Sequence, residues 1–159
     1  MAPSITVREI KAADYPLLED FLYHAVFQPA GEPPIPRDII HRPEVFAYIK
    51  NFGGEHDCGV AAELDGQIIG MAWTRIIPGF GHIDAHTPEL AVSVLPEHQG
   101  RGAGTLMMSR LFELLEERGY RQTSLAVQQK NAAARFYARL GYHTVRENGE
   151  EFIMVKSLA

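Results

Sequence analysis

The most informative stretch of this 159-residue chain is Gln99-Gly100-Arg101-Gly102-Ala103-Gly104. An apolar run, Leu90 to Leu95, precedes it, and an amphipathic helical pattern follows it. Closely spaced glycines let the backbone approach a ligand, and the first amides of a helix have no partner within that helix. A strand, a glycine-rich loop and a helix in this order predict a site for an anion such as a pyrophosphate.

The residues after the glycines exclude two other phosphate-binding loops. A P-loop needs Gly-Lys-Ser/Thr, whereas Gly104 is followed by Thr105. A dinucleotide-binding loop needs a third glycine or alanine three places after Gly102, where Thr105 stands, and an acidic residue further on, where the sequence reads Ala126-Val127-Gln128-Gln129. A glycine-rich turn that merely joins a strand to a helix remains an alternative.

A second pattern runs from Asn131 to Tyr142 and reads Asn-Ala-Ala-Ala-Arg-Phe-Tyr-Ala-Arg-Leu-Gly-Tyr. Asn131 is a suitable N-cap, the alanines favour a helix, and Gly141 is suited to end that helix. On its own, this segment is equally well explained as a capped surface helix.

Together the two segments resemble motifs A and B of the GCN5-related N-acetyltransferases. Motif A is a bulged strand, then Gln/Arg-x-x-Gly-x-Gly/Ala and a helix, and Gln99, Gly102 and Gly104 fill this pattern. Motif B commonly places its tyrosine seven residues after the asparagine, whereas Tyr137 follows Asn131 by six. This departure leaves the contact of Asn131 open.

The resemblance covers nearly the whole chain and implies a single domain, residues 1–159, of the α/β (α+β) class. Its fold is a mixed central sheet of six to seven strands, flanked by about four helices and splayed between the fourth and fifth strands. Apolar patterns predict strands at 5–10, 59–64, 67–77, 90–95, 123–128, 142–145 and 152–155.

Turn and capping signals divide these segments. Asp65-Gly66 predicts a two-residue hairpin turn, and Asp14 is predicted to cap the first helix. Prolines predict a loop at 28–36, and a short helix is expected near 45–49.

In the family, coenzyme A lies where the fourth and fifth strands splay apart. The resemblance therefore implies acetyl-CoA as the cosubstrate, with pantetheine bound by backbone groups of Val92, Ser93 and Val94. The pyrophosphate would be held by the segment Gln99, Gly100, Arg101, Gly102, Ala103, Gly104 and Thr105, with Asn131 and Tyr137 completing the cofactor site.

Acetyl transfer to an amine needs proton movements that the resemblance assigns to particular side chains. Glu89, with Asp84 and His82 behind it, is the favoured general base, and a solvated strand-edge charge is the alternative. Tyr137 matches the tyrosine that protonates the departing thiolate, and an aromatic packed beside Phe136 is the alternative.

The family builds its acceptor site from the first two helices and the central strands. Acceptor contacts are accordingly expected from Tyr23, Tyr48, Trp73 and Asp84, and from residues 31–37. The predicted reaction is direct acetyl transfer to a primary amine of a small molecule or peptide. A non-catalytic acetyl-CoA-binding regulator and a transferase of another acyl group remain open.

Composition restricts the remaining functions. A net charge of −5 and a pI of 5.8 disfavour binding to nucleic acid or to anionic membranes. Cys58 is the single cysteine and is expected to be buried rather than nucleophilic. The segment His82-Ile83-Asp84-Ala85-His86 resembles a metal site, but a hydrogen-bonded turn is preferred and no metal is predicted.

The chain contains no apolar run of transmembrane length. Its start, Met1-Ala2-Pro3-Ser4, has no charged segment followed by a long apolar run, so a cytoplasmic location is expected. A homodimer would be compatible with the family resemblance.

Overall fold

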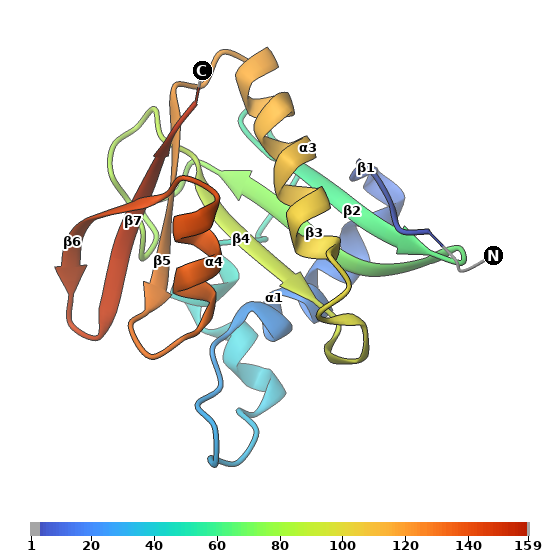
Figure 1. Ribbon diagram of the computed structural model, residues 1–159, viewed down its shortest axis with the longest axis horizontal. Helices are drawn as coiled ribbons and strands as arrows, with labels where there is room; N and C mark the ends of the chain where they lie inside the picture. Colours follow the sequence, from blue (N-terminus) through green and yellow to red (C-terminus); the bar gives the residue numbers. More distant parts are fainter. Residues whose placement is uncertain (1–3, 159) are drawn as a thin grey trace.

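Asp65-Gly66 joins β2 (Cys58–Leu64) to β3 (Gln67–Arg75), as the sequence predicts. Both turn residues have positive φ angles, 52° and 78°, which is the conformation that a two-residue hairpin turn requires. β1 (Thr6–Glu9) pairs with β2, and β4 (Glu89–Val94) pairs with β3. The computed structural model describes residues 4–158, and these antiparallel strands form one half of its sheet (Figure 1).

The other half contains β5 (Gln122–Gln128), β6 (His143–Asn148) and β7 (Glu151–Ser157), and the strand order is β1-β2-β3-β4-β5-β7-β6. β4 and β5 are the parallel neighbours, and in the described chain they share a single pair of Cα partners, Glu89 and Ser124. The mixed seven-stranded sheet with this splay confirms the predicted fold class.

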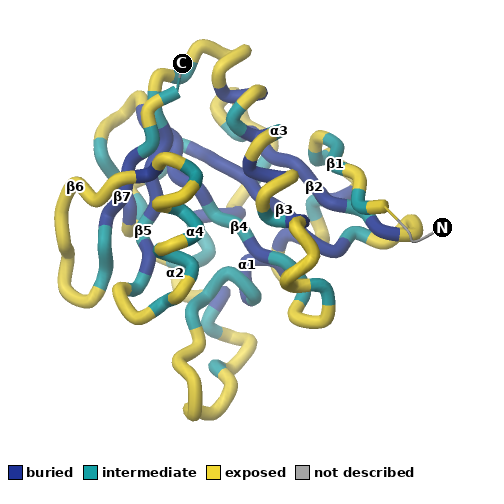
Figure 2. The backbone as a smooth tube through the Cα atoms, viewed as in Figure 1, coloured by how far each residue is buried: buried dark blue, intermediate teal, exposed yellow. Residues whose placement is uncertain are grey.

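Helices cover both faces of the sheet. α3 (Ala103–Glu117) and α4 (Ala133–Arg139) lie on one face, and α1 (Leu18–Ala25) and α2 (Pro43–Phe46) lie on the other (Figure 1). Neighbouring side chains on β3 point to opposite faces, so Ala72 packs in the core under α3 while Trp73 packs in the core under α1. The central strands are the most buried part of the chain, whereas β6 is an exposed edge (Figure 2).

The first helix begins differently from the prediction. A 3₁₀ segment, η1 (Ala12–Leu17), precedes α1, and Lys11 rather than Asp14 is its N-cap. Asp14 lies inside the first turn, where its carboxylate accepts the Lys11 N–H at 2.8 Å and pairs with Arg8 at 2.7 Å. The hydrogen bond and charge of Arg8 lower the pKa of Asp14. The carboxylate therefore stabilises this end of the helix from a position that spacing alone did not identify.

The segment 28–36 contains no helix or strand, as predicted, and leads into the 3₁₀ turn η2 (Arg37–His41). α2 lies two residues before its predicted position because Pro43 is suited to the first turn of a helix. A further 3₁₀ turn, η3 (Pro96–His98), connects β4 to the glycine-rich loop. The β6–β7 turn lies at 149–150, so β6 extends to Asn148.

A buried ion pair anchors the chain between α2 and β2. Arg75, at the end of β3, donates to both carboxylate oxygens of Asp57, at 3.0 and 2.9 Å. It also donates to the carbonyls of Ala47 and Lys50, at 3.0 and 2.8 Å. Since the Trp73 Nε1–H donates to the Tyr48 carbonyl at 2.9 Å, this network fixes the backbone that presents the Tyr48 side chain.

Candidate active site

The glycine-rich loop presents backbone amides that have no protein partner. Gly102 is the N-cap of α3 with φ 85°, and the first bond into the helix runs from the Leu106 N–H to its carbonyl at 3.1 Å. Within residues 4–158, the amides of residues 100–105 donate to no backbone or side-chain oxygen. A Cβ atom added at Gly100 or Gly102 would meet no atom within 4 Å. The loop therefore combines unpaired amide donors with glycines whose side-chain directions are open, and this combination suits a phosphate group.

The splay leaves part of β4 without a neighbour. The Leu95 N–H donates to Ile69 O at 2.8 Å, so ladder alternation directs the backbone groups of Ser93 toward β3 and those of Val92 and Val94 away from it. Gln99 Nε2 donates to Val94 O at 3.2 Å. The free edge at Val92 can pair with an extended ligand in the manner of an added strand.

Ser93 does not take the predicted part in this edge. Its backbone groups face β3, and its hydroxyl donates to Phe21 O at 2.7 Å. Strand alternation therefore turns the backbone groups of Ser93 away from the free edge, and the predicted cofactor contact of Ser93 stays a prediction.

A cavity of about 600 Å³ opens at the splay. Val92, Asn131 and Tyr137, which the sequence predicts for the cofactor site, line it, and so does Tyr48, which is predicted for the acceptor site. The apolar strand residues around the gap complete its inner wall: Leu90, Ala91, Leu125, Ala126 and Val127.

Tyr137 is held in this wall by aromatic neighbours, with ring centroids 5.6 Å from Phe136 and 5.8 Å from Tyr142. No described residue forms a hydrogen bond with its hydroxyl group. Burial raises the pKa of Tyr137 to about 12, which keeps the phenol protonated at neutral pH. The side chain is thus a permanent proton donor at the cavity wall.

Asn131 caps the start of α4, as the sequence predicts. Its side-chain oxygen accepts the Ala133 N–H at 2.9 Å, although the assigned N-cap is the next residue, Ala132. The Asn131 side chain therefore has its amide N–H groups left for a ligand.

Glu89 and Tyr48 form a buried pair beside the cavity. The Tyr48 hydroxyl donates to Glu89 Oε2 at 2.8 Å and accepts the Phe80 N–H at 3.0 Å, while the Gly79 N–H donates to Glu89 Oε1 at 3.2 Å. Glu89 is 1% exposed, so it is not the solvated strand-edge charge of the alternative interpretation. Burial raises the pKa of Glu89, and these hydrogen bonds partly oppose that rise. Tyr48 lines the cavity and Glu89 does not, so the tyrosine separates the carboxylate from it.

Other predicted acceptor residues do not line this cavity. Trp73 is fully buried, and the Tyr23 hydroxyl donates to Ile35 O in the loop before η2. Asp84 accepts the His86 N–H and the Thr87 hydroxyl, both at 2.8 Å, in the predicted turn. Packing and local hydrogen bonds occupy these side chains, so they lie outside this cavity, and their predicted acceptor contacts stay predictions.

The sequence reasoning missed another group of cavity residues. Side chains from the end of α1, η2, α2, the 76–88 segment and the β6–β7 turn complete the outer wall: Phe27, Ile39, Arg42, Glu44, Val45, Phe80, Glu150 and Glu151. In the sequence, the only sign of this wall was Phe80, an apolar residue between two glycines. Phe80 is 42% exposed in the structure.

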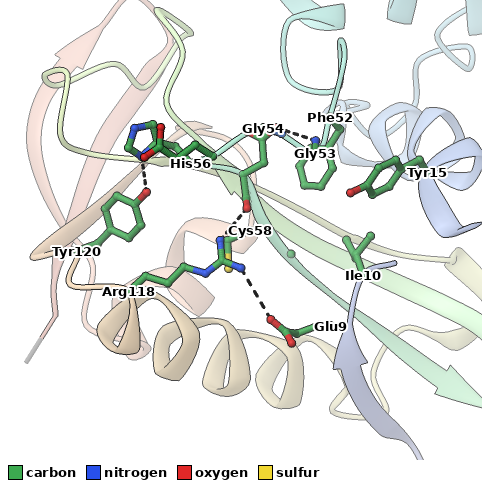
Figure 3. A pocket seen from close by; sticks show the side chains of 13 residues that line it. Glu9, Ile10, Tyr15, Phe52, Gly53, Gly54, His56, Cys58, Arg118 and Tyr120 are labelled. Atoms are coloured by element: carbon green, nitrogen blue, oxygen red, sulfur yellow. Dashed lines mark hydrogen bonds and ion pairs between the residues drawn. The ribbon is translucent and has the colours of Figure 1, made fainter. Parts of the chain in front are cut away.

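A second cavity, about 610 Å³, lies between β1, the start of β2 and the end of α3, and contains no residue of either motif (Figure 3). Its polar groups pair with each other: Arg118 donates to Asp57 O at 2.8 Å, and His56 Nδ1 lies 2.6 Å from the Tyr120 hydroxyl. Cys58 is buried here, as predicted, and burial raises the pKa of its thiol. Because these polar groups already have protein partners, we interpret this cavity as a structural feature rather than a second active site.

Among residues 4–158, no group of His, Cys, Asp and Glu side chains is arranged to hold a metal ion. The same described part of the chain contains no helix that is both long and apolar enough to span a membrane.

Comparisons with known proteins agree with this geometry. A sequence model of the acetyltransferase (GNAT) family matches residues 19–142. The [ribosomal protein bS18]-alanine N-acetyltransferase of Haemophilus influenzae is 30% identical over 103 residues, which are 65% of this chain and 66% of that protein. The mycothiol acetyltransferase of Tsukamurella paurometabola is 36% identical over 84 residues, which are 50% of this chain and 27% of that protein.

Solved structures show the same fold at low sequence identity. The PaiA N-acetyltransferase of Thermoplasma acidophilum, in complex with coenzyme A, aligns with a TM-score of 0.70 at 20% identity, covering 97% of this chain and 99% of that chain. The yncA protein of Salmonella typhimurium, with acetyl-CoA, aligns with a TM-score of 0.69 at 22% identity, covering 98% and 95%. With the family match spanning both motifs, the chain belongs to the acetyltransferase (GNAT) family.

Proposed function

We propose that this protein transfers an acetyl group directly from acetyl-CoA to a primary amine of a small molecule or peptide. The observation that carries the proposal is the cavity at the splay, which Val92 and Tyr137 line, together with the unpaired amides at 100–105 in the loop that follows β4. Structures of the same fold with coenzyme A and with acetyl-CoA support the choice of ligand.

The amides at 100–105 would bind the pyrophosphate, and the Arg101 side chain would add a positive charge. Val92 would pair with the pantetheine arm through its free backbone groups. Each negative charge at a helix N-terminus gains about 0.3–1 kcal/mol from the helix dipole, so several amides acting together outweigh one side chain. Binding energy is thus expected to depend on the loop backbone.

Deprotonation of the amine is the costly step before attack. An amine with a pKa near 10.4 loses its proton at pH 7 at a cost of about 4.6 kcal/mol. We propose that the amine proton passes to the Tyr48 oxygen while the Tyr48 proton passes to Glu89 Oε2, along the 2.8 Å hydrogen bond. Tyr48 is neutral before and after this transfer, and Glu89 becomes a carboxylic acid.

The neutral amine then attacks the thioester carbon, the C–S bond breaks, and coenzyme A leaves as a thiolate. The nitrogen, now part of the amide, loses its second proton to solvent, and the thiolate takes up a proton from solvent. The Tyr137 hydroxyl donates a hydrogen bond to the sulfur during this step. Because burial raises the pKa of Tyr137 to about 12, proton transfer to a free thiolate with a conjugate acid near 8.5 would be energetically uphill. The phenol is therefore expected to stabilise the sulfur mainly by hydrogen bonding while the bond breaks.

The relatives bound the acceptor only coarsely. One is named for acetylating an alanine of ribosomal protein bS18, and others are named mycothiol acetyltransferases. This chain spans 66% of the first protein and about a quarter of the second group, so these names do not fix its acceptor.

The proposed function predicts acceptor-dependent release of coenzyme A thiol from acetyl-CoA. The assay is thiol release against amino acids, polyamines, aminoglycosides, arylamines, arylalkylamines and short peptides, with acetyl-CoA affinity measured in parallel. Release with at least one amine is expected. Tight acetyl-CoA binding without release from any amine would favour the regulator, and absence of binding would contradict the cofactor site.

Tyr137→Phe is expected to lower kcat by about 10- to 100-fold and to leave the KM for acetyl-CoA within about twofold, because only the hydroxyl is removed. The measurement is steady-state kinetics with each substrate varied. Tyr142→Phe is the matched control, since its ring lies 5.8 Å from that of Tyr137 but does not line the cavity. An unchanged kcat in Tyr137→Phe would remove this hydroxyl from the mechanism.

A further inference from the structure

The outer wall of the cavity has an apolar surface that the cofactor site does not require. Phe27, Ile39, Val45 and Phe80 contribute to it from four separate segments. Phe80 is 42% exposed, and its ring stacks on Tyr48 with centroids 6.2 Å apart and an interplanar angle of 13°. Phe27, Ile39 and Val45 are partly buried, and apolar side chains that are left partly exposed in a concave site mark a surface that binds an apolar group.

The apolar surface adjoins the proposed point of proton removal. The Tyr48 hydroxyl donates a hydrogen bond to the buried Glu89, and the Phe80 ring stacks on the Tyr48 ring. A ligand that places its amine at the Tyr48 hydroxyl would therefore place its next few atoms against Phe80. The amine and the apolar group must be close together in such a ligand.

Charge at the same wall is predominantly negative. Glu44, Glu150 and Glu151 line it, against one cation, Arg42. In the described chain these carboxylates form no ion pair, and burial raises the pKa of Glu151. A cationic ligand would lessen the repulsion among these groups and gain attraction from them, whereas an anionic ligand would find Arg42 alone.

We propose that the acceptor is a primary amine attached through a short linker to an apolar group of about ring size, with no negative charge next to the amine. This proposal rests on the proposed acetyl transfer and names its acceptor class. An arylalkylamine and the N-terminus of a peptide that begins with an aromatic residue share this chemistry. A polyamine does not, because it has no apolar group of ring size to contact Phe80 and the other apolar side chains of the wall.

Competition between matched amines tests the acceptor class. 2-Phenylethylamine is expected to give a kcat/KM at least about tenfold higher than ethanolamine or spermidine, mainly through a lower KM. Phenylalanine tests the effect of an added carboxylate, and the amide of a Phe-Gly dipeptide tests the peptide source. Preference for spermidine or ethanolamine, with turnover intact, would overturn the acceptor class while leaving acetyl transfer standing.

Variants of the wall separate apolar contact from charge. Phe80→Ala should lower kcat/KM for 2-phenylethylamine by about tenfold more than that for ethanolamine, because only the first amine carries a ring to contact Phe80. Glu44→Gln with Glu150→Gln should lower kcat/KM for both amines severalfold at low salt, and less at high salt. Glu19→Gln, an exposed α1 residue outside the cavity, is the charge control. Equal losses with both amines in Phe80→Ala would contradict the apolar contact.

A binding measurement tests the acceptor class separately from the proposed acetyl transfer. The protein saturated with coenzyme A is titrated calorimetrically with 2-phenylethylamine and with spermidine. Preferential binding of 2-phenylethylamine, weakened in Phe80→Ala, would support the acceptor site even if no thiol were released. Binding of neither amine, or of spermidine alone, would overturn it.

Discussion

Replacing Gly102 with tryptophan is expected to lower the affinity for acetyl-CoA by at least about 100-fold in a folded protein. Two or more charge-assisted hydrogen bonds, each contributing about 1.5–3 kcal/mol, would be lost if the side chain filled the space in front of the amides. A Cβ at this position meets no protein atom within 4 Å, so the indole would extend into that space rather than into the core. Calorimetric titration with acetyl-CoA measures the effect.

The control for Gly102→Trp is Gly119→Trp. Gly119 lies just after the other end of the same helix, with φ 86° against 85° at Gly102, and a Cβ there also meets nothing within 4 Å. Both variants therefore carry a similar cost for a non-glycine residue in the left-handed region. We expect comparable melting temperatures in the two variants and loss of acetyl-CoA binding only in Gly102→Trp. Equal acetyl-CoA affinities in the two variants would contradict phosphate binding by the amides at 100–105.

Removing either member of the Tyr48–Glu89 pair is expected to lower kcat by about 100-fold with alkylamine acceptors. Tyr48→Phe and Glu89→Gln each interrupt the same proton transfer, so the double variant should be no slower than the slower single variant. An arylamine that is already neutral at pH 7 should be affected far less. Single-turnover kinetics with both acceptors provide the measurement, and additive losses would contradict a shared step.

The pH dependence supplies an independent readout for the same pair. Glu89 must be ionised to accept a proton, so kcat should fall as pH decreases through its pKa. Burial raises that pKa, and the acid limb is expected at a higher pH than an ordinary glutamate would give. Glu89→Gln should lack this limb. A limb that persists unchanged in Glu89→Gln would assign the titration to another group.

A structural control is needed because Tyr48→Phe also leaves buried groups unpaired. Tyr23→Phe removes another hydroxyl from a buried tyrosine, whose hydrogen bond is to Ile35 O, and Tyr23 does not line the cavity. A stability loss of about 1–3 kcal/mol is expected for the removal of one such hydrogen bond. Tyr23→Phe should lower the melting temperature. It should not lower kcat more with alkylamine acceptors than with an arylamine that is neutral at pH 7.

Turns, helix ends and the alternation of side chains along strands could be predicted from the sequence, because each depends on residues that are close together in the chain. Asp65-Gly66 specified a hairpin turn because its residues tolerate positive φ, and Gly102 specified the start of α3 for the same reason. The alternation along β3 and the apolar stripe of α3 then placed each side chain in a core. These local patterns are sufficient to place most of the strands along the chain and the glycine-rich loop before α3, whereas the sheet arrangement was expected from the family resemblance.

The tertiary structure alone decided which side chains share the cavity. Glu89 was predicted as a base from its position on a strand, but only packing revealed that Tyr48, 41 residues earlier in the chain, stands between it and the cavity. Phe80 and Glu44 carry no motif, and they meet because separate loops converge over the splay. Such contacts depend on the relative placement of distant segments, which no local spacing encodes, and they determine the proposed acceptor chemistry.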